Sequence, residues 1–272
     1  MAGIEHWTPL KDTHAIQSCQ LSVHFGEAVG EVLWKRAESQ AWKQAVDLGF
    51  GERQPLNGLP FPIQLPFQLP PEVVGDQGFI FARRDDSGAT TDQLTITRQG
   101  LTYEQFVYTR WAPFRQRAHK LMAEVVEAYA AVSSLAAIAS GYTDVFVSGG
   151  SDEARVQDIV HPDGPFVASG ALRDDALWHT HSGFFEHPDA FTRRLIQVNI
   201  DIGGAPPRNR PANVQIGTRI ADQFGQPEMT ALMPEQVSWG FMLQHADEQH
   251  LRLKELLRQV LTDPAAHSIS LT

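Results

Sequence analysis

The residues best suited to chemistry are concentrated in one stretch, A-L-W-H-T-H-S-G-F-F-E-H-P-D-A, which covers residues 176–190. Alternating residues of a β-strand share a face, so His179 and His181 would point the same way if this stretch is extended. Two imidazoles on one face can reach a single divalent ion, and Glu186 would add a carboxylate five residues later. The pattern predicts a metal site of His179, His181 and Glu186 for iron, manganese or zinc, with Asp189 as a general base.

The spacing H-x-H-x4-E resembles the first metal-binding motif of the cupins, small barrels that hold a metal with histidines and a glutamate. The glycines that flank this motif in cupins are missing at the corresponding places, and G-G-A-P-P-R-N-R-P provides no second cupin motif. The JAMM metalloproteases also combine H-x-H with a downstream aspartate, for which Asp189 is the candidate, but their Ser-x-x-Asp ending is missing. The alternative interpretation is the solvent-facing strand of a hairpin, in which His187-Pro188-Asp189 forms the turn before the next strand.

A second group of candidate residues is aromatic. Tyr108, Trp111 and Phe114 follow one another at three-residue spacing, so they would lie close to one face of the opening turn of a helix. Such a cluster can bind a ligand or a partner, but it also serves to anchor a helix to a sheet. The sequence favours the anchor.

Composition limits the classes of protein to consider. The chain has 272 residues, of which 42% are hydrophobic and 20% charged, which is typical of a globular protein. Its net charge of −10 argues against a general affinity for nucleic acid or anionic membranes. Cys19 is the only cysteine, which excludes an internal disulfide, and no apolar run approaches the length of about 18 residues that a membrane span needs. The first residues lack the basic start and apolar core of a signal peptide, so we expect a cytoplasmic protein.

Hydrophobic periodicity predicts the elements that position these residues. Strict alternation over 17–25 predicts a half-buried strand. Further strands are predicted on both sides of the Asp-Asp-Ser-Gly turn within 78–98, and at 101–109, 142–148, 176–185, 194–202 and 213–220. Helices are predicted at 27–48, 113–140 and 247–261, the last with Asp247 as its N-cap. Because strands and helices rarely alternate, the pattern predicts an α+β fold with a largely antiparallel sheet.

The predicted organisation is a single compact unit over residues 1–272. It would consist of two strand-rich lobes, approximately 1–140 and 141–272, around the long helix at 113–140, and no fixed-period repeat is evident. The proline-rich segment within 52–76, densest over 55–71, is either a polyproline ligand for a partner domain or an extended segment held against the protein's own surface.

Several segments occur in a familiar order: C-Q-L-S-V-H-F near the start, Y-T-R-W-A-P-F-R at 108–115, and D-E-Q-H-L-R-L-K-E-L-L-R-Q-V-L-T near the end. This order resembles a sporadically distributed family of uncharacterised bacterial proteins of similar length. In that family a Tyr-x-x-Trp-x-x-Phe element opens a long helix, and a Leu-Asp-x-x-His helix ends the chain. The residues that match these motifs are Tyr108, Trp111, Phe114, Asp247 and His250, whereas G-Y-T-D at 141–144 lacks the family's arginine. The resemblance implies an accessory role in a defence or immunity type of gene neighbourhood, and it provides no catalytic residues to transfer.

The sequence therefore favours a non-enzymatic cytosolic protein that acts by binding a protein or peptide partner, with no cofactor and with neither nucleic acid nor membrane as its target. A homo-oligomer is compatible with this hypothesis. The alternative is a metal-dependent oxygenase or hydrolase that uses His179, His181 and Glu186. A third class, a protein that binds a small molecule in a cleft between the lobes, is less favoured.

Overall fold

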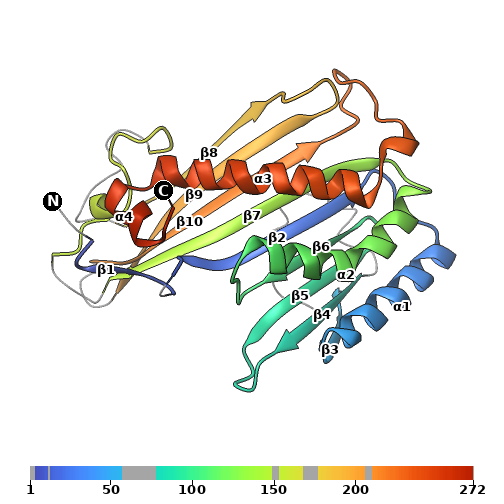
Figure 1. Ribbon diagram of the computed structural model, residues 1–272, viewed down its shortest axis with the longest axis horizontal. Helices are drawn as coiled ribbons and strands as arrows, with labels where there is room; N and C mark the ends of the chain where they lie inside the picture. Colours follow the sequence, from blue (N-terminus) through green and yellow to red (C-terminus); the bar gives the residue numbers. More distant parts are fainter. Residues whose placement is uncertain are drawn as a thin grey trace. The chain divides into compact units, whose positions relative to one another are not determined.

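A computed structural model describes residues 4–11, 13–56, 78–148, 153–167, 177–205 and 210–271 (Figure 1). Its strands are β1 (Trp7–Pro9), β2 (Ile16–Phe25), β3 (Glu52–Pro55), β4 (Gly78–Arg84), β5 (Thr90–Thr97), β6 (Gly100–Gln105), β7 (Leu135–Ser148), β8 (His179–Glu186), β9 (Arg193–Ala205) and β10 (Arg210–Gln223). Its α-helices are α1 (Glu31–Asp47), α2 (Trp111–Ala130), α3 (Trp239–Val260) and α4 (Asp263–Ser268). The pairs β1–β7, β3–β4, β4–β5, β5–β6 and β8–β9 are antiparallel. The predicted α+β class with a largely antiparallel sheet is therefore confirmed.

The chain forms two compact units, and the second is inserted twice into the first. Unit 1 comprises Met1–Cys19, Ala139–Asp222 and His245–Thr272, and unit 2 comprises Gln20–Ile138 and Gln223–Gln244. Strands β2 and β7 and helix α3 contribute residues to both units.

Unit 2 is built around one hydrophobic face of its strands, which follow the order β3-β4-β5-β6-β2-β7. Helix α1 packs on this face through Trp34, whose ring stacks on Phe79 of β4 at a centroid distance of 6.3 Å. Helix α2 packs through Phe114, whose ring stacks on Tyr103 of β6 at 5.1 Å. Asp92 of β5 is buried among polar partners here and accepts a hydrogen bond of 2.6 Å from the Tyr103 hydroxyl.

In unit 1 the strands follow the order β7-β10-β9-β8, and β1 pairs with the C-terminal end of β7. Helix α3 covers one face, since its side chains reach residues of β7, β8 and β10. The even-numbered side chains of β9 point to this face: Thr192 just before the strand is buried, as are Arg194, Ile196, Val198, Ile200 and Ile202. The odd-numbered side chains over 193–201 are only half-buried. The opposite face of β8 and β9 is therefore accessible to solvent.

Among the described residues, both units contain a strand followed by a meander that returns to pair next to it, but unit 2 has helix α1 after its first strand and four meander strands against three in unit 1. In unit 2 the first strand, β2, is followed by the meander β3-β4-β5-β6, whose last strand pairs next to β2 and leads into α2. In unit 1 the first strand, β7, is followed by the meander β8-β9-β10, whose last strand pairs next to β7 and leads into α3.

The predicted long central helix at 113–140 was wrong in extent. Helix α2 ends at Ala130, and the chain is extended again from Leu135 onward as β7. The hydroxyl of Ser133 accepts a hydrogen bond from the backbone N–H of Glu27 and donates one to the backbone C=O of Glu27. These hydrogen bonds stabilise a non-helical conformation directly after α2. The segment L-A-A-I-A-S has a composition that suits helices, but both of its faces are largely buried, so periodicity could not identify it as a strand.

The predicted start of the last long helix at Asp247 was also wrong. Helix α3 begins at Trp239, and the hydroxyl of Ser238 accepts a hydrogen bond of 3.1 Å from the N–H of Phe241, as an N-cap side chain does. Asp247 lies within the helix. The residues predicted to face inward, Leu253, Leu256, Leu257 and Val260, are all buried. Most of the proline-rich segment, residues 57–77, lies outside the described residues. Glu52–Pro55 at its start forms β3.

Candidate functional site

The histidine-rich stretch forms β8, an eight-residue strand that pairs antiparallel with β9. His179 lies opposite Asp201, and His181 lies opposite Asn199. The two imidazoles share a face as predicted, and their ring centroids are 5.4 Å apart. The hairpin interpretation of this stretch is confirmed, because residues 187–192 form the bend that leads into β9.

The structure does not bring Glu186 to the two histidines. It is five residues from His181, and an odd spacing along a strand places two side chains on opposite faces. The Glu186 carboxylate instead accepts a hydrogen bond of 2.7 Å from the guanidinium of Arg252 on α3. The predicted ligand set of His179, His181 and Glu186 is therefore not assembled. Within the described ranges, no group of three or more His, Cys, Asp or Glu side chains could hold a metal ion.

Asp189, the predicted general base, has a structural role in the bend. Its carboxylate accepts a hydrogen bond of 2.7 Å from the N–H of Phe191 and one of 3.0 Å from the hydroxyl of Thr192. This is the local pattern by which aspartate stabilises a turn.

The aromatic cluster anchors α2 to the strands of unit 2. Phe114 is fully buried and contacts three rings: Tyr103 at 5.1 Å, Trp111 at 5.5 Å and Tyr108 at 6.4 Å between centroids. Tyr108 is buried as well, and Trp111 is half-buried. The geometry is that of a packed helix-to-sheet contact, and it leaves little aromatic surface for a partner.

One edge of β8 pairs with no other described strand, because β8 ends the order of the described strands. The N–H of Ile202 donates to the C=O of Trp178. In an antiparallel pair, hydrogen-bonded and non-hydrogen-bonded residue pairs alternate. With the constant register of β8 and β9, the even-numbered residues of β8 therefore bond to β9. The backbone groups of the odd-numbered residues point away from β9: His179, His181, Gly183 and Phe185. We call these backbone groups the β8 edge.

Within the part of the chain that the structure describes, the β8 edge lacks the features that usually protect a terminal strand. Strand β3, which ends the strand order of unit 2, has only four residues, carries Glu52 and Arg53, and ends at Pro55. Strand β8 has eight residues and no proline or lysine, and its one carboxylate, Glu186, is already paired with Arg252. Strand β8 is therefore long enough and uncharged enough to pair with another strand.

Two phenylalanines place apolar surface beside this edge, one on each face of the strand. Phe184 is 38% exposed, and its ring stacks on Phe166 at 6.3 Å. Phe185 is 53% exposed, with the guanidinium of Arg193 lying 5.0 Å from its centroid. Exposed aromatic residues at a sheet edge supply contact area to an incoming chain at a low entropic cost.

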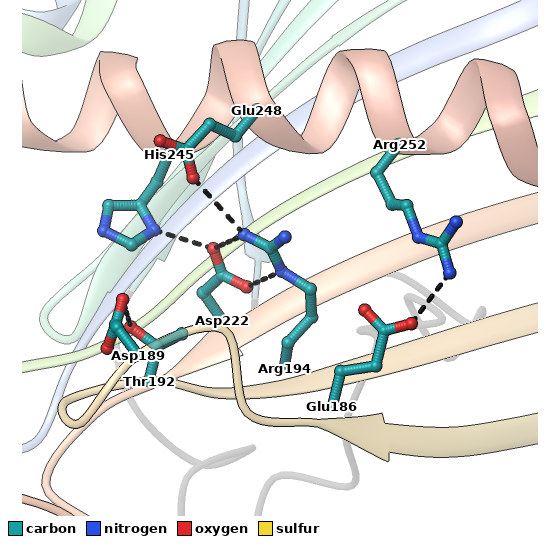
Figure 2. A network of polar contacts seen from close by, with 8 residues as sticks. All are labelled: Glu186, Asp189, Thr192, Arg194, Asp222, His245, Glu248 and Arg252. Carbon is teal, nitrogen blue, oxygen red and sulfur yellow. Dashed lines mark hydrogen bonds and ion pairs between the residues drawn. The ribbon is translucent and has the colours of Figure 1, made fainter.

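A buried ionic network holds the hairpin against α3 (Figure 2). The Nε of Arg194 on β9 donates to Asp222 of β10 at 2.6 Å, and a terminal nitrogen donates to the other carboxylate oxygen at 2.9 Å. The Nδ1 of His245 on α3 lies 2.8 Å from the same carboxylate. Asp222 is fully buried, and Arg194 and His245 are each 7% exposed. Burial by itself would raise the pKa of Asp222, but the hydrogen bonds from Arg194 and His245 outweigh it and hold this pKa below its usual value of 3.8.

The same helix also fixes the C-terminal end of β8. Glu186 forms an ion pair with Arg252, which lies on α3 on the C-terminal side of His245, as Figure 2 shows. Glu248 lies 3.8 Å from Arg194 and adds a second, more exposed carboxylate to the network. These contacts hold β8 and β9 against α3 in their extended conformation.

Sequence reasoning missed Arg194, Asp222 and His245. They are far apart along the chain, and each belongs to an element whose neighbouring residues are mainly apolar. The only available signal was the position of Arg194, which alternates with the apolar residues of the predicted strand 194–202, because a charged residue on an inward face needs a charged partner; Asp222 lies beyond the predicted strand 213–220.

Two further buried groups on α3 and β7 titrate abnormally. Burial, reinforced by Lys254 and opposed by Asp247, lowers the pKa of His250 to about 4, so this imidazole is neutral beside the Tyr142 hydroxyl at 2.8 Å. Burial raises the pKa of Asp144 on β7 to about 7, and neither of its carboxylate oxygens has a hydrogen-bond partner among the described residues. Both groups belong to unit 1, where Asp144 is buried and His250 is half-buried.

No protein-family model matches this chain, and no curated protein sequence does so either. None of the helices among the described residues is long and apolar enough to cross a lipid bilayer.

Proposed function

We propose that this protein is a non-enzymatic binding protein that captures an extended polypeptide segment of a partner by adding it as a strand to the β8 edge. The observation that carries the proposal is the outward direction of the backbone groups of the four odd-numbered residues in β8, which is the terminal strand of the order formed by the described residues. Each of these residues offers one N–H and one C=O, so the edge offers eight groups to an incoming backbone. Strand addition of this kind derives its affinity from main-chain hydrogen bonds and its selectivity from side chains beside the new strand.

The surroundings of the edge indicate what the segment resembles. The segment would lie between the two exposed aromatic residues, Phe184 on one face and Phe185 on the other, so apolar or aromatic side chains at its matching positions would be favoured. Strand β8 itself contains no lysine or arginine, and the whole chain has a net charge of −10. These features support a polypeptide partner over a nucleic acid or an anionic membrane.

A cytoplasmic location and an accessory role in a defence or immunity system belong to the same proposal. The chain has a single cysteine, Cys19, which is buried, and a chain without an internal disulfide suits a reducing compartment. The resemblance to a sporadically distributed bacterial family supports the accessory role.

The test uses a peptide-display library of random twelve-residue sequences selected against the full chain in buffer containing a chelator. Selected peptides are synthesised, and their Kd values are measured by fluorescence anisotropy for the wild type, His181→Ala and His181→Pro. Proline at this position removes an outward N–H and no bond of the β8–β9 ladder, so the hairpin should remain intact. The lost hydrogen bond and the ring's bulk should weaken peptide binding at least tenfold, since a net hydrogen bond contributes about 1 kcal/mol and a steric clash adds to it.

His181→Ala is the matched control, because it removes the imidazole and keeps the backbone N–H. It should retain a Kd within about threefold of the wild type. The proposal is wrong if the library yields no peptide with saturable binding, or if the alanine and proline variants weaken binding equally. Circular dichroism of both variants checks that the fold is retained.

A further inference from the structure

We infer that His179 and His181 form a two-imidazole chelate for a divalent transition metal on the accessible face of the β8–β9 hairpin. This site is distinct from the predicted set with Glu186, and it does not depend on strand addition at the β8 edge.

The separation of the two rings suits one shared ion. Zinc and similar ions bind imidazole nitrogens at about 2.0–2.1 Å, and a ring nitrogen lies about 1.1 Å from its own centroid, so each centroid would lie about 3.2 Å from the ion. Two imidazoles at a tetrahedral angle then have centroids about 5 Å apart. The rings of His179 and His181 are 5.4 Å apart and inclined by 54° to each other, so side-chain rotation alone can bring both nitrogens to one ion.

Both imidazoles are accessible and lack a competing hydrogen bond within the described part of the chain. His179 and His181 are exposed, and the nearest charged atom to His181 Nε2 is a carboxylate oxygen of Asp201 at 3.9 Å, beyond hydrogen-bond distance. Other histidines are committed elsewhere. Nitrogens of His14, His161, His245 and His250 contact the Ile16 N–H, the Asp163 N–H, the Asp222 carboxylate and the Tyr142 hydroxyl, respectively.

The neighbouring charge favours a cation. Asp201 lies directly opposite His179 in the ladder and points to the same accessible face, with its side chain 50% exposed. Its carboxylate can accept a hydrogen bond from a metal-bound water without being a direct ligand, as acidic groups around metal sites commonly do. Two neutral imidazoles select borderline ions, and the Irving–Williams order makes Cu²⁺ the tightest of Cu²⁺, Ni²⁺ and Zn²⁺.

The experiment uses the full chain without a histidine tag. Binding of Cu²⁺, Ni²⁺ and Zn²⁺ is measured by calorimetry and equilibrium dialysis, and electron paramagnetic resonance of the Cu²⁺ complex counts the coordinated nitrogens. We expect one ion per chain, two equivalent nitrogen ligands and an affinity order with Cu²⁺ first. His179→Ala and His181→Ala should each weaken binding at least tenfold, and Asp201→Asn should weaken it two- to fivefold.

Two controls separate this site from its alternatives. His187→Ala removes an exposed histidine of the adjoining bend and should leave the affinity unchanged, and Glu186→Gln tests the ligand set predicted from the sequence and should also leave it unchanged. The inference is overturned if the double variant His179→Ala/His181→Ala binds Cu²⁺ as tightly as the wild type, if His187→Ala loses binding to the same extent, or if none of the three ions binds saturably. Peptide capture by this double variant in chelator buffer reports separately on the proposed function.

Discussion

Asp144 provides the sharpest test of the energetics of unit 1. The side chain lies on β7 with 1% exposure, and neither oxygen has a hydrogen-bond partner among the described residues. Burial raises its pKa from 3.8 to about 7. A carboxylic acid with a raised folded-state pKa stabilises the protein most below its unfolded-state pKa, and that contribution is lost as the pH rises through the folded-state value.

The expected magnitude follows from the shift. About three pKa units at about 1.4 kcal/mol each give about 4 kcal/mol, which the folded protein loses between pH 4 and pH 8. Asp144→Asn keeps the size of the side chain and cannot ionise. We therefore expect the variant to exceed the wild type in unfolding free energy by less than 1 kcal/mol at pH 4 and by about 4 kcal/mol at pH 8.

The assay is urea denaturation followed by tryptophan fluorescence and circular dichroism at half-unit steps from pH 4 to pH 8.5. Asp163→Asn, a substitution at an exposed carboxylate, is the control and should change the free energy by less than about 0.5 kcal/mol. A difference between Asp144→Asn and the wild type that does not grow with pH, or an asparagine variant that is less stable at pH 8, would refute the reasoning.

Four further substitutions are tested by the same denaturation assay. Asp222→Asn weakens the buried network and leaves charges uncompensated, so a loss of about 3–5 kcal/mol is expected at pH 7, and an unchanged midpoint would contradict the supporting role of the network. Gly100→Ala would drive its Cβ into the backbone C=O of Val23 and should destabilise by more than 2 kcal/mol. Gly51→Ala, where a Cβ meets nothing within 4 Å, should be nearly neutral. Asp92→Asn should lose about 2 kcal/mol at pH 7. Burial alone would raise the pKa of Asp92, but the hydrogen bond from Tyr103 and the charge of Arg117 outweigh burial and hold this pKa below its usual value. The ionised Asp92 therefore stabilises the folded protein above pH 4, and this contribution disappears as the pH falls through the folded-state pKa.

Much of the fold was predictable from local patterns. The run R-L-I-Q-V-N-I-D-I identified β9, because this strand buries one face and half-exposes the other. The alternation in 17–25 also identified β2, although Ser22 and His24 on its polar face are buried as well. The hairpin containing β8 and β9 was also predicted, from the turn chemistry of Pro188 and Asp189.

The errors occurred where burial on both sides removes periodicity. The start of β7 carries small apolar residues on both faces, which is compatible with a helix as well as a strand, and only pairing with other strands decides between them. The start of α3 was missed because W-G-F has low helix propensity, which the Ser238 cap and the burial of Trp239 and Met242 overcome.

The candidate site was only partly visible in the sequence. Strand periodicity predicted that His179 and His181 share a face, and it could also have excluded Glu186, since five residues is an odd spacing. The β8 edge depends on which strand lies last in the sheet and on which residues bond to β9. Both are properties of tertiary pairing, and no local pattern determines them.

Residue-resolved amide hydrogen exchange of β8 tests strand capture most directly. In the free protein, the amides of Thr180, Ser182 and Phe184 should exchange slowly because they bond to β9, while the odd-numbered amides exchange rapidly. Addition of a library-selected peptide should slow exchange at His179, His181, Gly183 and Phe185 and leave the even-numbered amides unchanged. If the peptide binds and the odd-numbered amides still exchange rapidly, the β8 edge is not the binding site.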